Sequence, residues 1–211
     1  MKQIILVRHG QSTNNLPNSV IGSWSDVELT KLGIRQAKAV AERLSNELEG
    51  DITMYSSDLR RARQTAEIIC KRLDVVPKYV LELREHYFGI ASGMNGKEAM
   101  KYRVKKDPPT LDWRPWPEAE SWGEFYTRVA SFMDKLMETE ERVLIVSHGG
   151  TIQNIIRWWL GTPSSDFFKV AFETANTSVT VLDATQYNVR RVERLNDTAH
   201  YAMIDISNPI K

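Results

Sequence analysis

Two of the four histidines in this chain occupy the same sequence setting, which predicts a site for an anion. His9 and His148 each lie two positions past an apolar run, at 4–7 and at 143–146, and glycine follows each histidine. Glycine permits a tight backbone turn and lets main-chain amides approach a ligand. Free N–H groups at the start of a helix or turn favour negative charge. A single histidine would indicate a packed structural residue, whereas the doubled pattern indicates a functional pair.

Arginines next to these segments supply the positive charge that an anion site needs. Arg8 directly precedes the first histidine, and Arg60 lies in the first turn of a helix expected after the strand 52–55. A cation at a helix N-terminus is unfavourable by about 0.3–1 kcal/mol, and a bound anion would offset that cost. We therefore expect Arg8 and Arg60 in the site. Arg61 and Arg63 are explained equally well as surface residues paired with carboxylates.

The elements that must position these residues are strands and helices in alternation. The quartets at 4–7 and 143–146 are continuous and rich in β-branched residues, as in parallel strands buried on both faces. Shorter strands are expected at 52–55, 79–81, 179–182 and 188–195. Amphipathic helices are expected after three capping positions, at Thr30, at Ser56 or Ser57, and at Ser121. This alternation predicts an α/β fold, a three-layer α/β/α sandwich with a mostly parallel central sheet, which binds ligands beyond its strand ends.

Composition narrows the class of protein further. The 211 residues suit a single domain, 1–211. Lys and Arg number 28 against 27 Asp and Glu, so no global field would hold the chain on nucleic acid or on a membrane. The apolar run at 4–7 is shorter than the roughly 7–15 residues that a signal peptide needs. The one cysteine, Cys70, rules out an intramolecular disulfide and a four-cysteine zinc site. It suits a reducing compartment, so we expect a cytoplasmic protein.

Five motifs, in order along nearly the whole chain, resemble those of the histidine phosphatase superfamily, also called phosphoglycerate-mutase-like. They are Arg8-His9-Gly10-Gln11-Ser12 followed by Asn15, the segment 26–37, the arginine-bearing segment 55–66, Leu83-Arg84-Glu85 with Phe88-Gly89 and Gly93, and Ser147-His148-Gly149-Gly150. Arg-His-Gly by itself is a weak signal. The five motifs in this order are specific.

The resemblance implies a role for each matched residue. His9 is implied to be the nucleophile that becomes a phosphohistidine, and Glu85 the proton donor to the leaving group. No metal and no other cofactor is implied. Residues implied to bind the phosphoryl group are Arg8, Arg60, His148, Asn15 and Gly149.

These residue types suit phosphoryl transfer. Each guanidinium group can bind phosphate oxygens through two hydrogen bonds. A neutral imidazole can attack phosphorus with one nitrogen while the other keeps its proton on a fixed acceptor. Water then hydrolyses the intermediate, which splits one hard step into two easier ones. Because an alkoxide is a poor leaving group, a protonated carboxyl group must donate a proton to the leaving oxygen. Proton transfer of this kind typically increases the rate by about 10²–10⁴-fold.

The segment 97–122 is expected to shape the substrate pocket. It combines a Pro-rich stretch and two tryptophans with the cations Lys97, Lys101, Arg103, Lys105, Lys106 and Arg114. We expect it to form a lid whose cations meet a second anionic group on the substrate. A solvated basic face with a tryptophan-anchored surface loop explains the same residues at least as well. Ala91-Ser92 and Glu118-Ala119 stand where the superfamily usually carries Trp-Glu and Gly-Gly, which leaves the substrate open.

Three functions fit these observations. The favoured one is a metal-independent phosphatase that hydrolyses a small phosphorylated metabolite, because a compact lid admits water. The alternatives are a bisphosphoglycerate-dependent phosphoglycerate mutase and a non-catalytic phosphate-binding protein on the same fold. The remaining histidines, His86 and His200, are expected to be packed or loop residues. The sequence leaves the oligomeric state open, with a homodimer among the outcomes.

Overall fold

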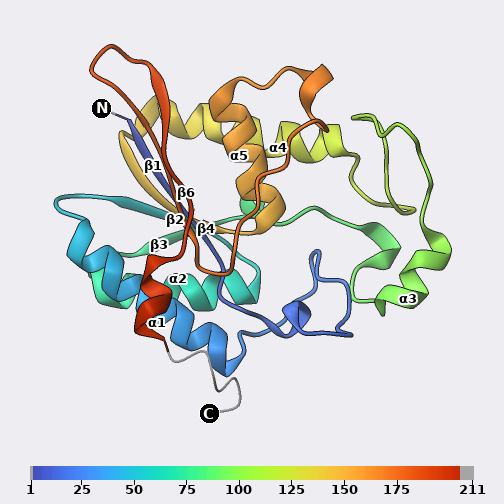
Figure 1. The fold of residues 1–211 in the computed structure, drawn as a ribbon, viewed down its shortest axis with the longest axis horizontal. Coiled ribbons are helices and arrows are strands. Elements are labelled where there is room, and N and C mark those ends of the chain that lie inside the picture. The colour runs from blue at the N-terminus through green and yellow to red at the C-terminus, as the bar shows by residue number, and fades with distance from the viewer. Residues whose placement is uncertain (1, 205–211) are drawn as a thin grey trace.

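The predicted strands assemble into a six-stranded sheet with the order β3-β2-β4-β1-β5-β6 (Figure 1). The computed structural model describes residues 2–204, so the predicted domain, 1–211, extends past the described part at both ends. The strands are β1 (Gln3–Arg8), β2 (Thr53–Ser57), β3 (Pro77–Val80), β4 (Arg142–Ser147), β5 (Val179–Ala184) and β6 (Arg190–Asp197). The α-helices are α1 (Lys31–Glu47), α2 (Arg60–Leu73), α3 (Gly96–Ala99), α4 (Trp122–Thr139) and α5 (Gly149–Leu160).

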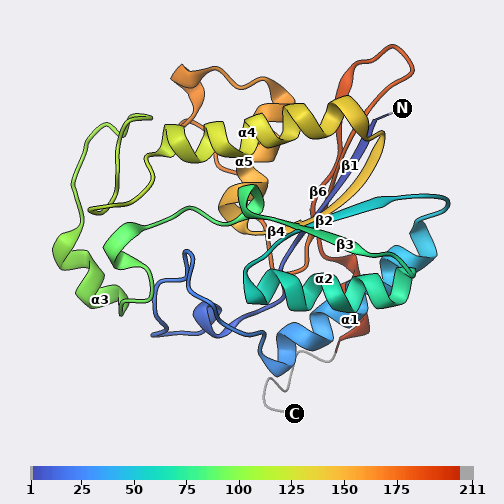
Figure 2. The same cartoon turned by 180° about the vertical axis from the view of Figure 1, so that it is seen from behind.

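Helices cover both faces of this sheet, which confirms the predicted three-layer sandwich. The strands β3, β2, β4 and β1 are parallel, and β5 and β6 are antiparallel to their neighbours. Helices α4 and α5 lie on one face, and α1 and α2 on the other (Figures 1 and 2). Along β1, Ile4 and Leu6 belong to one core, and Ile5 and Val7 belong to the other. A central strand buried on both faces needs apolar residues at every position, which explains the continuous quartets.

The strand register brings the two histidine segments together. β1 and β4 are parallel neighbours in which Arg8 pairs with Ser147. The next residues, His9 and His148, therefore leave the same edge of the sheet side by side. β2 lies on the other side of β4, and α2 begins just beyond its carboxyl end. The carboxyl ends of three adjacent strands thus converge where α/β sheets bind their ligands.

The start of one helix differs from the prediction. Thr30 caps α1 with its hydroxyl group, and Ser121 forms the predicted capping box with Glu124 at the start of α4. Helix α2 instead begins at Arg60 without a side-chain cap, and Ser57 is the last residue of β2. The buried stripe of α2 includes Arg61, Ala62, Thr65 and Ala66.

The segment 97–122 lies beside the sandwich and has a small core of its own. Trp116 is buried against Ala91, Ala99 and Ala119, and its indole N–H donates to the carbonyl of Ala99 at 3.0 Å. Figure 1 shows this segment, in green to yellow-green, to one side of the sheet beyond the start of α4. The satellite core explains how a polar, Pro-rich stretch keeps a defined position.

The longer helices are amphipathic rather than apolar all round. Helices α1, α2, α4 and α5 each bury one stripe of residues against the sheet. Within residues 2–204, no helix has both the length and the apolar character needed to cross a membrane.

Candidate active site

His9 lies just past β1 as a buried, neutral imidazole. Its Nδ1 is 2.8 Å from the carbonyl oxygen of Gly10. Since a carbonyl only accepts, Nδ1 carries the proton and Nε2 carries the lone pair. Burial, followed by the charges of Arg61 and Arg8, holds the pKa of His9 well below its ordinary value. The ring is therefore in the state that nucleophilic attack through Nε2 requires.

Gly10 anchors this turn to two helices. Its N–H donates to Thr65 Oγ1 at 3.0 Å, and the Thr65 hydroxyl donates to the carbonyl of Arg61 at 2.8 Å. A Cβ at Gly10 would lie 2.5 Å from the carbonyl oxygen of Gly33. Only glycine allows this close approach of the two backbones. The turn that carries the histidine is thus tied to both α1 and α2.

Arg61, and not Arg60, is the arginine of α2 that lies beside His9, which corrects the prediction. Arg61 is 3% exposed, and its Nε donates to His9 Nε2 at 3.3 Å. Its terminal nitrogens donate to the carbonyls of Ser25 and Ser23 at 2.9 and 2.8 Å. The side chain of Arg60 is 51% exposed and pairs with a surface carboxylate. Successive helical residues are rotated by about 100°, so adjacent arginines cannot both face the sheet.

Arg8 and His148 complete a polar cluster around His9. The ring centroids of the two histidines are 5.1 Å apart, and His148 Nε2 lies 2.8 Å from Ser57 Oγ. Arg8 donates to the carbonyl of Thr174 at 2.6 Å. Among the described residues nothing bonds Nδ1 of His148 or Nε of Arg8, although both atoms are buried. Unpaired buried polar atoms cost about 1–3 kcal/mol each, so an oxyanion among these groups would be stabilised.

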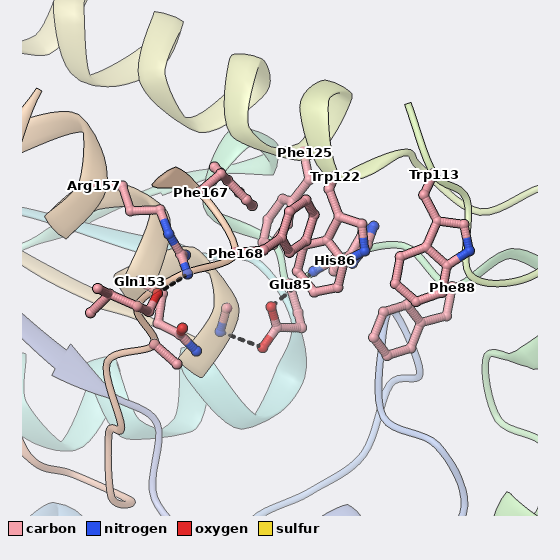
Figure 3. Close-up of a pocket in the computed structure, with 13 residues that line it drawn as sticks. Glu85, His86, Phe88, Trp113, Trp122, Phe125, Gln153, Arg157, Phe167 and Phe168 are labelled. Carbon is pink, nitrogen blue, oxygen red and sulfur yellow. Dashed lines mark hydrogen bonds between the residues drawn. The ribbon is translucent and has the colours of Figure 1, made fainter. Parts of the chain in front are cut away.

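Glu85 lies at the N-terminus of α5, where two main-chain N–H groups hold its carboxylate. Oε2 accepts from Gly150 at 3.1 Å, and Oε1 accepts from His86 at 2.9 Å (Figure 3). A Cβ at Gly150 would lie 2.4 Å from Glu85 Oε1, so a larger residue there would displace the carboxylate from its present position. The charge of Glu85 raises the pKa of both Arg8 and Arg61, against the larger lowering by burial. The acid therefore shares an electrostatic environment with the nucleophile.

Arg128 of α4 holds the segment that carries this acid, and it lies outside the five sequence motifs. It donates to the carbonyls of Glu82, Arg84 and Glu85 at 2.8, 3.1 and 3.2 Å. It also forms an ion pair with Glu120 at 2.7 Å. Periodicity places Arg128 on the polar side of an amphipathic helix, so no local signal distinguishes it from a solvated residue.

Asn15 and Gly149 lie at the edge of the cluster. Asn15 Oδ1 accepts from the N–H of Ser12 at 2.9 Å, and Gly149 begins α5 close to the guanidinium group of Arg8. Asn176, which lies outside the sequence motifs, donates to the carbonyl of His9 at 3.0 Å. It precedes β5, and an antiparallel strand starts at the edge where parallel strands end. A search for residues that follow strands therefore overlooks it.

A cavity of about 380 Å³ opens beside Glu85 and Gly150 (Figure 3). Its lining includes the charged residues Glu85 and Arg157. Most of its lining is aromatic and comes from His86, Phe88, Trp113, Trp122, Phe125, Phe167 and Phe168. The segment 97–122 thus reaches the cavity through Trp113 and Trp122.

None of the cations of the segment 97–122 is among the residues that line the cavity, and three of them contact other groups. Lys106 bonds both carboxylate oxygens of Asp112 at 2.9 Å. Arg114 pairs with a carboxylate of α4, and the guanidinium group of Arg103 lies 5.5 Å from the ring centroid of Trp113. Rings rather than charges are what this segment brings to the cavity.

His86 and His200 are buried packing residues, in agreement with the expectation for them. The ring of His86 stacks on Phe125 with centroids 4.8 Å apart and an interplanar angle of 9°. His200 Nε2 lies 3.1 Å from Thr177 Oγ1. Burial lowers the pKa of His86, and it lowers that of His200 to about 4. Both rings are neutral at neutral pH.

The arrangement can carry out phosphoryl transfer. A phosphoryl group between His9 Nε2 and Glu85 would face a neutral nucleophile, two guanidinium groups and a carboxyl group, which are the parts that this reaction needs. Over residues 2–204, the His, Cys, Asp and Glu side chains form no group of three or more that could hold a metal ion.

Comparison with known proteins places these features in a wider group. Residues 4–198 match the family model described as histidine phosphatase superfamily (branch 1). The chain is 31% identical over 207 residues to phosphoglycerate mutase-like protein 4 of Arabidopsis thaliana, covering 94% of this chain and 86% of that protein. It is 33% identical over 162 residues to a metal-independent phosphoserine phosphatase of the same plant, covering 72% and 66%. A solved mycobacterial glucosyl-3-phosphoglycerate phosphatase superposes with a TM-score of 0.78 at 25% identity, covering 92% of this chain and 98% of that one.

Proposed function

The chain belongs to the histidine phosphatase superfamily, as its motifs predicted, with a match to the model of branch 1, and on that premise we propose that it hydrolyses phosphomonoesters through a phosphohistidine at His9. The state of His9 carries the proposal, because Nδ1 is fixed on Gly10 and Nε2 lies beside Arg61. Two relatives support it, since their names give them phosphoserine and glucosyl-3-phosphoglycerate as substrates.

In the first step, Nε2 of His9 attacks phosphorus and the bond between phosphorus and the ester oxygen breaks. The ester oxygen takes the proton of Glu85 and leaves as an alcohol, so no alkoxide accumulates. Arg61 exchanges its hydrogen bond to Nε2 for bonds to phosphoryl oxygens, and Arg8 binds the same group. The two cations offset the negative charge that these oxygens carry.

In the second step, water attacks phosphorus and the bond to Nε2 of His9 breaks, which returns the lone pair to the ring. The carboxylate of Glu85 takes a proton from the water, so the acid is restored and inorganic phosphate is released. Ser57 can donate its hydroxyl proton to His148 Nε2, which leaves the proton of that ring on Nδ1 for a phosphoryl oxygen.

The test of this proposal is release of inorganic phosphate together with trapping of the phosphoenzyme. We expect His9→Ala to abolish turnover of p-nitrophenyl phosphate and any acid-labile phosphorylation of the protein. His200→Gln changes a buried histidine outside the cluster and should retain both. A folded His9→Ala variant that still turns over and still becomes labelled would contradict the role of His9.

The same assay separates the alternatives. The name of one relative, phosphoglycerate mutase-like protein 4, makes phosphoryl transfer to a second phosphoglycerate the competing activity. Phosphate release without interconversion of 2- and 3-phosphoglycerate supports the hydrolase. Interconversion faster than release supports the mutase, and phosphate binding without either reaction supports a non-catalytic protein.

A further inference from the structure

The cavity beside Glu85 is the place where the alcohol part of a phosphate ester would bind. A proton donor must lie within about 2.6–3.2 Å of the leaving oxygen, so the organic group on that oxygen enters the space that Glu85 lines. In Figure 3, the rings of Trp113 and Trp122 lie on one side of Glu85, and Arg157 and Gln153 lie on the other. The character of this lining therefore selects the alcohol part of the substrate.

The aromatic walls are held by contacts among the rings themselves. His86 stacks on Phe125 at 4.8 Å, Trp122 meets Phe168 edge-on at 5.8 Å, and Phe167 meets Phe168 edge-on at 5.0 Å. Such contacts fix ring orientation. Phe168 is nevertheless 39% exposed, an apolar surface that a bound group would cover. The cavity thus offers fixed planar walls to a planar apolar group.

Arg157 of α5 is a buried cation in this lining with no carboxylate partner among the described residues. Its side chain donates to the carbonyl of Val170 at 3.0 Å and to Asn154 Oδ1 at 3.5 Å, and the residue is 7% exposed. The guanidinium carbon lies 4.5 Å from the ring centroid of Phe167. A buried cation without an anion is costly, and a guanidinium group has five N–H donors, more than these two acceptors use.

We propose, as an extension of the proposed function, that the substrate is the phosphate ester of an alcohol with a planar apolar body that ends in a carboxylate. The phosphoryl group lies at His9, the planar body lies against Phe167 and Phe168, and the carboxylate meets Arg157, which packs on the ring of Phe167. In phosphoserine and phosphoglycerate the carboxylate lies within two carbons of the ester oxygen and no apolar body is present. These small esters leave the rings uncovered.

Three esters of primary alcohols test the two parts of the proposal separately, with kcat/KM from phosphate release as the measurement. Benzyl phosphate is expected to exceed glycerol 3-phosphate by about ten-fold or more, because it covers the aromatic walls. Phosphate esterified to 4-(hydroxymethyl)benzoic acid is expected to exceed benzyl phosphate by about ten-fold or more, because its carboxylate accepts charge-assisted hydrogen bonds from Arg157.

Arg157→Gln is expected to remove the preference for the carboxylated ester over benzyl phosphate. Arg190→Gln is the matched control and should keep it. Arg190 also lies over the rings of Trp158 and Trp159 and donates to their carbonyls, but it is an exposed residue of β6 outside the cavity lining. Each ratio compares two substrates on one preparation, so a loss of folded protein cancels.

Phe168→Ala tests the aromatic wall at a second, partly exposed residue, on the side of the cavity where Arg157 lies. It should lower kcat/KM for both benzyl esters relative to glycerol 3-phosphate while the carboxylate preference stays. Equal kcat/KM for all three esters overturns the inference and leaves the proposed function intact. A carboxylate preference that survives Arg157→Gln overturns the assignment of Arg157. Absence of phosphate release from every ester, p-nitrophenyl phosphate included, overturns the proposed function itself.

Discussion

The imidazole of His9 is kept neutral by the groups around it. Burial and the neighbouring guanidinium groups of Arg61 and Arg8 lower its pKa, while the carbonyl of Gly10 acts against them but fixes the tautomer. Protonation of His9 would place a third cation beside Arg61 and Arg8 in a largely buried site. The same two arginines would bind a phosphoryl dianion. Their two charges therefore keep His9 unprotonated and also attract the phosphoryl group that His9 attacks.

At Arg61 we predict a large effect and at Arg60 a small one. Arg61→Gln removes a buried, preorganised donor and should lower kcat/KM for p-nitrophenyl phosphate by about 10²–10³-fold. Arg60→Gln breaks an exposed ion pair and should change it by less than about three-fold. Parallel kinetics on the two variants check this. A larger loss at Arg60 would contradict the orientation of α2.

At the scale of elements, two helices aim the acid. Helix α5 presents the N–H of Gly150 to the carboxylate of Glu85. From α4, Arg128 holds the main-chain carbonyls of the segment that carries the acid, and Glu120 holds Arg128 in turn. Arg128 is therefore a positioning residue, which acts on the chemistry through Glu85.

Arg128→Gln is expected to have the same kinetic effect as Glu85→Gln, but a smaller one. Glu85→Gln should slow an alkyl phosphate far more than p-nitrophenyl phosphate, because nitrophenolate leaves without a proton. Arg128→Gln should show the same inequality, at about ten-fold for the alkyl ester. The exposed Arg114, which pairs with Glu124 on the same helix, supplies the control Arg114→Gln. An equal loss on both substrates would reduce Arg128 to a structural role.

At the scale of the whole molecule, the sheet delivers polar residues from distant segments to one buried edge, and this burial affects stability. His9, His86, His148 and His200 are all buried. Burial is the largest cause of the lowered pKa of each ring. The native protein therefore holds four imidazoles that resist protonation, whereas the unfolded chain protonates them near pH 6.5.

We predict that the free energy of unfolding falls as the pH is lowered from 7 to 5. Between the lowered native pKa and about 6.5 the unfolded state binds more protons, so stability rises with pH across that window. For His200 the window extends down to about pH 4, and His200→Gln should flatten the dependence. Urea unfolding at pH 7, 6 and 5 measures it. Constant or increasing stability on acidification would contradict the prediction.

Local sequence determined the buried strands of the sheet and the placement of the two histidines that follow them. The continuous quartets at 4–7 and 143–146 specify strands buried on both faces, since no other position in a sheet needs apolar residues throughout. Because His9 and His148 directly follow such strands, they were bound to reach one edge of a parallel sheet. The capping box at Ser121 is likewise a local matter, because its donors and acceptors lie within four residues.

Only the tertiary structure decided which side chains enter the site. Arg61 replaces Arg60 because Arg61 lies on the buried stripe of α2 with Ala62 and Thr65, and one residue of helical rotation exchanges a buried position for an exposed one. The cavity walls come from segments far apart in the chain, including Trp113, Phe125 and Phe168. These residues are neighbours in the folded structure, but they share no periodic pattern in the sequence. Contacts between residues far apart in the chain depend on helix rotation and on the packing of remote segments. A local sequence pattern contains no information about either.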